Sequence, residues 1–161
     1  MPPAVHRLSI LLLPADPDTP GERAEALRAR LERDGWLSGD TPGPRALVDG
    51  GFARARVEVF DTPRFASNNQ GGFRVSCPVD GASVVVPFSR ALERWRNGGP
   101  RALACTCGET HDLAALVYAP EAGFARGWLA LLDVGGAAVD PAALALADEV
   151  LGGVRVVARR A

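Results

Sequence analysis

The first third of the chain has the hydrophobic pattern of a strand, a helix and a second strand. A short apolar run over 5–13, stopped by a proline, predicts a buried strand. Apolar residues then recur at the spacing of one helix face over 20–34, which predicts an amphipathic helix. Thr19 and Glu22 have the spacing of a capping box at its start. An alternating stretch over 46–60 predicts a further strand.

The last third repeats this order of elements. A long apolar run over 124–134 predicts a buried strand. Asp140 is a typical N-cap and precedes a proline, so a helix is expected over 141–151. A short apolar stretch over 154–157 predicts the final strand.

The middle of the chain is less regular. We expect a loop over 61–72, whose polar tail 67–72 is interpreted as a connecting turn, with a recognition loop as the alternative. Residues 84–86 are interpreted as a short strand that ends at a proline, and Ser89 as the cap of a short helix. Residues 116–118 are expected to form another strand.

The element order predicts an α+β fold. Two strand–helix–strand units can pack into an antiparallel sheet with both helices on one face, the ferredoxin-like split βαβ arrangement. We expect this sheet domain to comprise 1–72 and 119–161, with residues 73–118 inserted between its two halves.

Two short cysteine turns lie inside the insertion. The first is Cys77-Pro78-Val79-Asp80-Gly81 and the second is Cys105-Thr106-Cys107-Gly108. They resemble the two knuckles of a zinc ribbon, whose usual forms are Cys-Pro-x-Cys-Gly and Cys-x-x-Cys-Gly. The resemblance implies four ligands around a tetrahedral zinc ion with a structural role, which stabilises a segment too small to have a core of its own.

The chain departs from the ribbon pattern at two points. Asp80 stands where the second cysteine would be, and the second turn is one residue short. Two ligand sets therefore stay open: Cys77, Cys105 and Cys107 with Asp80, or the same thiols with His111. The other alternative is a metal-free relic, because Pro-Val-Asp-Gly is a good turn without a metal.

Composition narrows the class of protein. The chain has 161 residues, of which 47% are hydrophobic and 23% charged, as in ordinary globular proteins. The net charge of -1 does not favour binding to nucleic acid or to an anionic membrane. A local patch of arginines, interrupted by Glu93, keeps nucleic-acid binding open as an alternative. These arginines are Arg90, Arg94, Arg96 and Arg101.

Arginine supplies all 18 basic residues and lysine is absent. The bias is typical of a GC-rich bacterial genome. The absence of lysine excludes Schiff-base catalysis by a lysine and a Walker-type phosphate loop, which needs one. The run Leu8–Leu13 is too short for a signal peptide or a membrane span, so we expect a cytoplasmic protein with three cysteines that are thiols or metal ligands.

No catalytic motif is recognisable in the sequence. Nucleotide-binding glycine loops and a Gly-x-Ser-x-Gly elbow are absent. By elimination we expect a non-catalytic binding or interaction protein, of accessory or immunity type, with a protein partner. The alternatives are a nucleic-acid-binding ribbon protein and an enzyme with an unrecognised site around the cysteine turns or the Asn-rich loop. Cys107 and His111 could form a nucleophile–base pair, but no third, orienting group is recognisable beside them.

Overall fold

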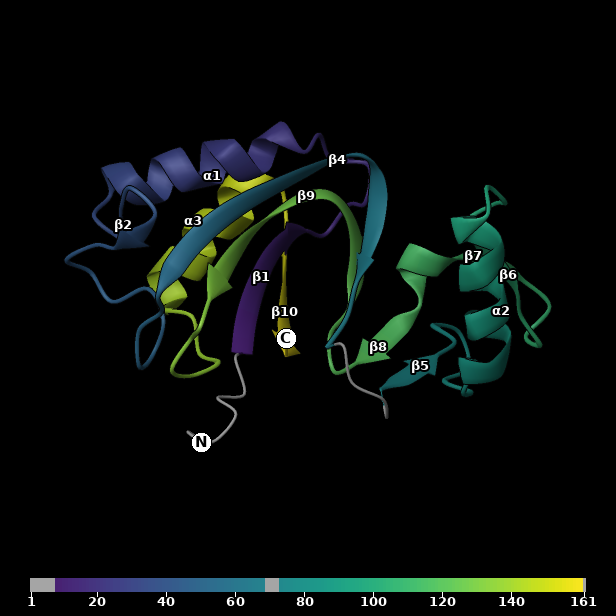
Figure 1. Cartoon of the computed structure of the whole chain (residues 1–161). Coiled ribbons are helices and arrows are strands. Elements are labelled where there is room, and N and C mark those ends of the chain that lie inside the picture. Colours follow the sequence, from purple (N-terminus) through teal and green to yellow (C-terminus); the bar gives the residue numbers. More distant parts are fainter. Residues whose placement is uncertain (1–7, 69–72, 161) are drawn as a thin grey trace, which may run out of the picture. The chain divides into compact units, whose positions relative to one another are not determined.

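The computed structural model describes residues 8–68 and 73–160. The chain divides into two compact units. The sheet unit consists of Met1–Gln70 and Glu121–Ala161, and the cysteine unit of Gly71–Pro120. Together the described residues form three α-helices and several small sheets (Figure 1).

A four-stranded sheet is the centre of the sheet unit. Its strands are β1 (Leu8–Pro14), β4 (Arg54–Ala66), β9 (Gly123–Leu132) and β10 (Val154–Arg160). Their order is β10-β1-β9-β4, and every neighbouring pair is antiparallel. Strand β1 is central, and its residues from the second onward are all buried. Burial on both faces explains why its sequence is apolar without alternation from Ile10 onward.

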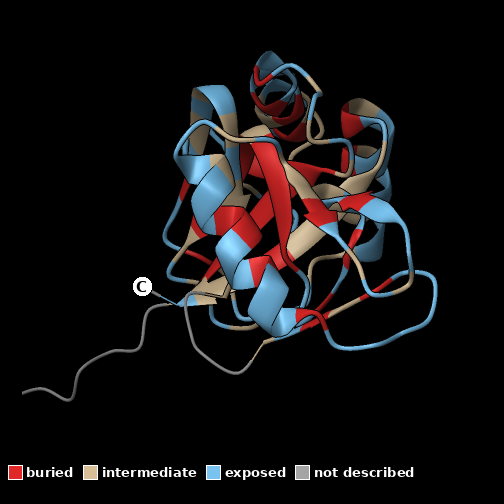
Figure 2. Cartoon of the chain, turned by 90° about the vertical axis from the view of Figure 1, so that its right-hand side faces the viewer, coloured by how far each residue is buried: buried red, intermediate tan, exposed pale blue. Residues whose placement is uncertain are grey.

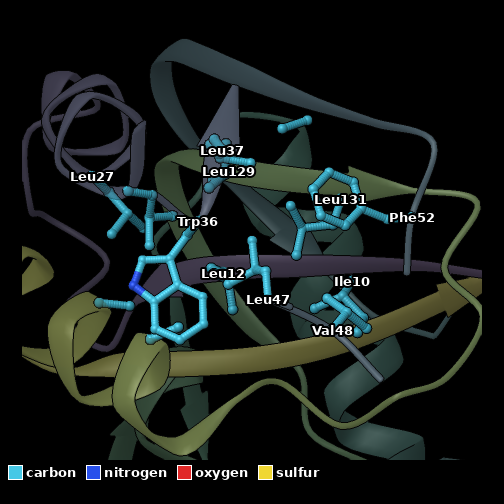
Figure 3. Close-up of a cluster of buried hydrophobic side chains, with 14 of the residues drawn as sticks. Ile10, Leu12, Leu27, Trp36, Leu37, Leu47, Val48, Phe52, Leu129 and Leu131 are labelled. Carbon is cyan, nitrogen blue, oxygen red and sulfur yellow. The ribbon is translucent and has the colours of Figure 1, made fainter. Parts of the chain in front are cut away.

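Two helices, α1 (Glu22–Arg33) and α3 (Pro141–Leu151), lie on one face of this sheet (Figure 1). Their apolar sides close a core with alternate residues of the central strands, and a short hairpin of β2 (Leu37–Ser38) and β3 (Thr41–Pro42) completes it. Figure 3 shows the larger side chains of this core: Ile10, Leu12, Leu27, Trp36, Leu37, Leu47, Val48, Phe52, Leu129 and Leu131. Burial of these apolar side chains is the main stabilising term for the unit.

A bend in the paired strands β4 and β9 covers part of the other face. Between the pairs Val59–Gly127 and Arg64–Ala125 the register shifts, because β4 has more residues there than β9. Ala66 and Ala125, which lie beyond the bend, join a second buried cluster with residues of β1, β9 and β10. The cluster consists of Leu11, Leu13, Ala66, Ala125, Trp128, Ala130 and Val157. The β4–β9 pair therefore supplies side chains to both cores of the unit.

Close backbone contact joins α1 to this bend. A Cβ atom on Gly127 would lie 2.8 Å from the Cα atom of Gly21, which precedes the helix. A Cβ atom on Gly21 would lie 2.5 Å from the carbonyl oxygen of Arg126. Both distances are shorter than carbon and oxygen atoms tolerate, so the helix can approach the strand only because both positions are glycine.

The cysteine unit contains short strands around one helix. Its elements are β5 (Arg74–Ser76), α2 (Val85–Arg96), β6 (Ala102–Ala104), β7 (Thr110–Asp112), the 3₁₀ turn η1 (Leu113–Ala115) and β8 (Val117–Ala119). Strand β5 pairs with β8, and β6 pairs with β7, both antiparallel.

A small apolar core holds this unit together. Phe88 of α2 is 1% exposed, and its ring meets those of Phe73 and Tyr118 edge to face, with centroids 6.1 and 5.6 Å apart. Figure 2 shows α2 with buried positions on one side and exposed positions on the other. The helix is therefore amphipathic and contributes one face to the core.

The structure confirms some of the predicted boundaries. Helix α3 begins after Asp140, whose carboxylate accepts hydrogen bonds from the N–H groups of Ala142 and Ala143. It ends at Gly152, which has the left-handed conformation typical of a helix C-terminus.

Other predicted boundaries are wrong. Helix α1 is preceded by Gly21 and has no side-chain cap, so Thr19 does not cap it. Residues 84–86 are not a strand, because α2 begins at Val85 and includes Ser89. Pro87 does not end an element there: it lies in the first helical turn, where the missing N–H has no intrahelical partner to lose.

The expected loop over 61–72 is also partly wrong, because β4 continues to Ala66. The end of the Asn-rich stretch, residues 69–72, lies outside the described residues. Among the helices that are described, none is long and apolar enough to span a membrane.

Candidate metal centre

The first cysteine turn closes a tight hairpin after β5. Cys77 donates its N–H to the carbonyl oxygen of Ala82 at 2.8 Å, and Gly81 donates its N–H to the carbonyl oxygen of Cys77 at 3.0 Å. Gly81 has a φ of 74°, a conformation that glycine adopts without strain. The N–H of Val79 lies 3.3 Å from the Cys77 sulfur and donates to it. The turn thus places a buried sulfur, 2% exposed as a residue, beside a backbone donor.

Asp80 stabilises the conformation of this turn. Its carboxylate accepts a hydrogen bond from the N–H of Ala82 at 3.0 Å, the geometry of an Asx turn. This N–H, followed by the neighbouring Cys77 thiol, lowers the pKa of Asp80 below its ordinary value. The residue is exposed, and its carboxylate is occupied by the turn's backbone.

The second cysteine turn joins β6 to β7. Cys105 donates its N–H to the carbonyl oxygen of Glu109 at 2.9 Å, and Gly108 donates its N–H to the carbonyl oxygen of Cys105 at 3.1 Å. Gly108 has a φ of 95°, so glycine is again required for the turn. Both Cys105 and Cys107 are half-buried here.

His111 reaches both turns from β7. It lies opposite Leu103 in the β6–β7 register and is 8% exposed. Its Nε2 atom is 3.3 Å from the Cys107 sulfur and 3.5 Å from the Cys77 sulfur. A buried imidazole therefore lies between thiols from two different hairpins.

Four potential ligand atoms meet at one point. They belong to Cys77, Cys105, Cys107 and His111, and all lie within 4.8 Å of one another. Zinc bonds of about 2.3 Å to sulfur and 2.0–2.1 Å to nitrogen imply tetrahedral edges of about 3.8 Å between sulfurs and about 3.6 Å between sulfur and nitrogen. The two measured nitrogen–sulfur distances match the second value. The cluster has the size of a site for one ion.

The thiols crowd one another electrostatically. A backbone N–H at Cys107 lowers the pKa of Cys105. The pKa of Cys107 is lowered by the backbone N–H of Glu109, but desolvation and the Cys105 and Cys77 sulfurs together raise it to about 11. Three thiolates this close repel one another, and a bound cation would remove that repulsion.

An ion pair fixes the open end of the β6–β7 hairpin. Arg101 donates from Nε and Nη2 to the two carboxylate oxygens of Asp112, at 2.9 and 3.1 Å. Asp112 also accepts from the N–H of Ala114 at 2.9 Å. The bidentate pair lies next to His111 in the chain, so it holds the strand that carries the imidazole. The sequence signal for this pair is an arginine before the second cysteine turn and an aspartate after it, which alone does not predict the contact.

This pairing takes one residue from the arginine patch on which the nucleic-acid alternative depends, because Arg101 is bound to Asp112. Arg90 and Arg94 line an open depression of about 480 Å³ at the end of α2, together with Glu93. Arg94 and Arg96 lie in the last turn of α2, where basic side chains interact favourably with the helix carbonyl groups, so these two arginines need no ligand to account for them.

Four of the five expected ligand residues are thus brought together, and Asp80 is outside the group. Comparison of the chain with models of known protein families, with curated proteins and with solved structures finds no match.

Proposed function

We propose that the cysteine unit is a structural zinc module. The ion would be held by Cys77, Cys105, Cys107 and His111. The observation that carries this proposal is the convergence of three thiols and one imidazole from two hairpins within 4.8 Å. Three sulfurs and one nitrogen in a tetrahedral arrangement are a donor set typical of structural zinc sites.

The module's size supports a structural role for the ion. The apolar core around Phe88 is small, and the strands are three residues long. The two cysteine turns lie about 30 residues apart in sequence, and an ion bound to both would cross-link them. Metal-binding free energy then becomes folding free energy of the unit.

The same geometry supports finer assignments of fold. Two glycine-containing cysteine turns on antiparallel hairpins are consistent with a degenerate zinc ribbon whose fourth ligand is His111 instead of a second cysteine in the first turn. The antiparallel order β10-β1-β9-β4, with α1 and α3 on one face, supports a ferredoxin-like arrangement of the sheet unit.

We infer a non-catalytic binding role for the whole protein. Four protein ligands complete the coordination sphere of a tetrahedral zinc ion and leave no position for a water or substrate. Catalytic zinc, in contrast, keeps one coordination position open. A reducing compartment such as the cytoplasm suits a chain with three free thiols.

Exposed apolar side chains support a protein as the partner. Among the described residues, four large hydrophobic side chains of the cysteine unit are exposed: Val79, Val85, Val86 and Val117. Val79 belongs to the first cysteine turn itself. A contiguous exposed apolar patch is typical of a protein-interaction surface, and these valines are the residues that would contribute to one.

Native mass spectrometry tests the zinc assignment. Full-length protein purified without chelator should carry one zinc ion per chain, and Co²⁺ substitution should give the intense absorption of a tetrahedral thiolate site. Replacement of His111 by alanine should weaken metal binding and reduce this absorption, and Asp80→Asn, the matched control in the first turn, should leave both unchanged. Protein of metal-free mass that also fails to bind added Zn²⁺ would refute the proposal.

The binding role is tested with the zinc-loaded chain. The wild type and a Val79→Asp/Val86→Asp variant are first shown to hold zinc. The wild type should then recover a partner protein better than the variant does, and the purified partner is titrated with each form. Equal affinity of the two forms for that partner would remove the apolar surface from the proposal. Turnover of a small molecule by the zinc-loaded protein would favour the enzyme alternative.

A further inference from the structure

The three thiols of the cluster differ in access to solvent. Cys77 is 2% exposed, and its sulfur accepts the N–H of Val79. Cys105 and Cys107 are half-buried and stand at the tip of the β6–β7 hairpin with one residue between them. Cys105 and Cys107 are therefore the two cysteine residues more accessible to a small oxidant from solution.

The turn also places these two cysteines at a suitable separation. Consecutive Cα atoms are about 3.8 Å apart, so the first and third residues of a turn lie roughly 5–6 Å apart. A disulfide needs Cα atoms about 4.4–6.8 Å apart. The hydrogen bond from Gly108 to Cys105 keeps the turn closed, and both sulfurs point to the common centre of the cluster.

We propose that Cys105 and Cys107 form a peroxide-sensitive dithiol that closes to a disulfide and expels the metal. The site is thus a modification site as well as a metal centre. For its metal-dependent part, the inference rests on the zinc module proposed above; formation of the disulfide in metal-free protein stands independently of it.

The chemistry needs hydrogen peroxide as the oxidant and two steps. In the first, one sulfur attacks the peroxide, the O–O bond breaks, and a sulfenic acid and one water form. In the second, the other thiol attacks the sulfenic sulfur, the S–S bond forms, and the hydroxyl leaves as a second water. The two sulfurs lose two electrons in total, and the peroxide gains them.

Bound zinc opposes this reaction. The lone pairs that would attack the peroxide are shared with the ion, so coordination lowers the nucleophilicity of both sulfurs. Once the disulfide has formed, only Cys77 and His111 remain as ligands, and two ligands are too few to retain zinc. Oxidation and metal release are therefore coupled one to one.

Mass spectrometry of the full-length protein provides the test. Metal-free protein treated with hydrogen peroxide should lose about 2 Da, the mass of two hydrogens. Tryptic digestion should place the link within the peptide 102–126, which contains both cysteines, and leave Cys77 as a thiol in the peptide 75–90. The zinc-loaded protein should react about tenfold more slowly and release one zinc per disulfide, as read by a colorimetric zinc indicator.

Two variants separate the claims. Cys77→Ser should lose zinc affinity but still form the disulfide, whereas Cys107→Ser should lose both properties. A link between the peptides 75–90 and 102–126, or oxidation of single sulfurs to sulfinic acid without loss of two hydrogens, would overturn the inference. A disulfide in a chain that never binds zinc would instead refute the zinc module and leave the dithiol intact.

Discussion

The Nε2 atom of His111 lies 3.5 Å from the sulfur of Cys77, although the two residues are 34 positions apart. The contact joins β7 to the turn after β5 and so closes the ring of potential ligands. It also distinguishes His111 from Asp80, whose carboxylate is bound to the backbone of its own turn. The first prediction follows from this difference.

Replacing His111 by alanine should weaken zinc binding by about a hundredfold or more, since a direct ligand is lost and second-sphere changes alone cost about 10–100-fold. Asp80→Asn keeps an acceptor for the N–H of Ala82, and its zinc affinity should stay within about threefold of the wild type. Competition against a chelator of known affinity measures both. Equal losses in the two variants would contradict the assignment of His111.

Removing the metal should loosen the cysteine unit selectively. After zinc is extracted by a chelator, backbone amides of β6 and β7 should lose protection from hydrogen exchange, because two three-residue strands have little other support. Amides of β1 and β9 belong to the separate four-stranded sheet and serve as the internal reference. Unchanged protection throughout the cysteine unit would show that the ion does not stabilise it.

The capping of α3 can be compared with the missing cap of α1. Asp140→Ala should destabilise the protein by about 1 kcal/mol, because two N–H groups at the start of α3 lose their acceptor. Thr19→Ala should change stability by less than about 0.5 kcal/mol, because no side chain caps α1. Urea denaturation followed by tryptophan fluorescence measures both. A larger loss for Thr19→Ala than for Asp140→Ala would contradict the structure.

The contact between α1 and the β4–β9 bend should tolerate no side chain. Gly127→Ala would place Cβ 2.8 Å from backbone atoms of Gly21, and should cost about 1–3 kcal/mol through displacement of the helix. In Gly123→Ala the nearest atoms are the side-chain ends of Arg155 and Leu13 at 3.0 Å, which can move, so the loss of unfolding free energy should be smaller. Equal thermal stability of Gly127→Ala and the wild type would show that this contact is looser than described.

Segments of the sheet unit with a strong local signal could be predicted from the sequence. The continuous apolar run of β1 and the Asp-Pro start of α3 each point to one structure by local physics alone. The bend in β4 could not be predicted, because residues up to Ala66 include a proline and polar positions that are typical of a loop. Pairing with β9, which is non-local, extends the strand through them.

The candidate site was predictable as a set of residue types but not as a geometry. Glycines after both cysteine turns indicated that the thiols could converge, and the structure confirms this for all three. The choice between Asp80 and His111 depended on the β6–β7 register, which places the imidazole inward opposite Leu103. Short strands of three residues carry too weak an alternation for sequence periodicity to reveal that register.

The pairing of Ala66 with Gly123 and of Arg74 with Ala119 brings the outgoing and returning chain together on each side of the boundary between the units. A polypeptide that leaves and re-enters through adjacent strands behaves as a cassette. A short hairpin turn could replace residues 71–120 in the host, and the excised piece could be transplanted into the tip of an unrelated β-hairpin. Evolution has the same freedom, since such a cassette can be gained, exchanged or lost without rebuilding the framework that carries it.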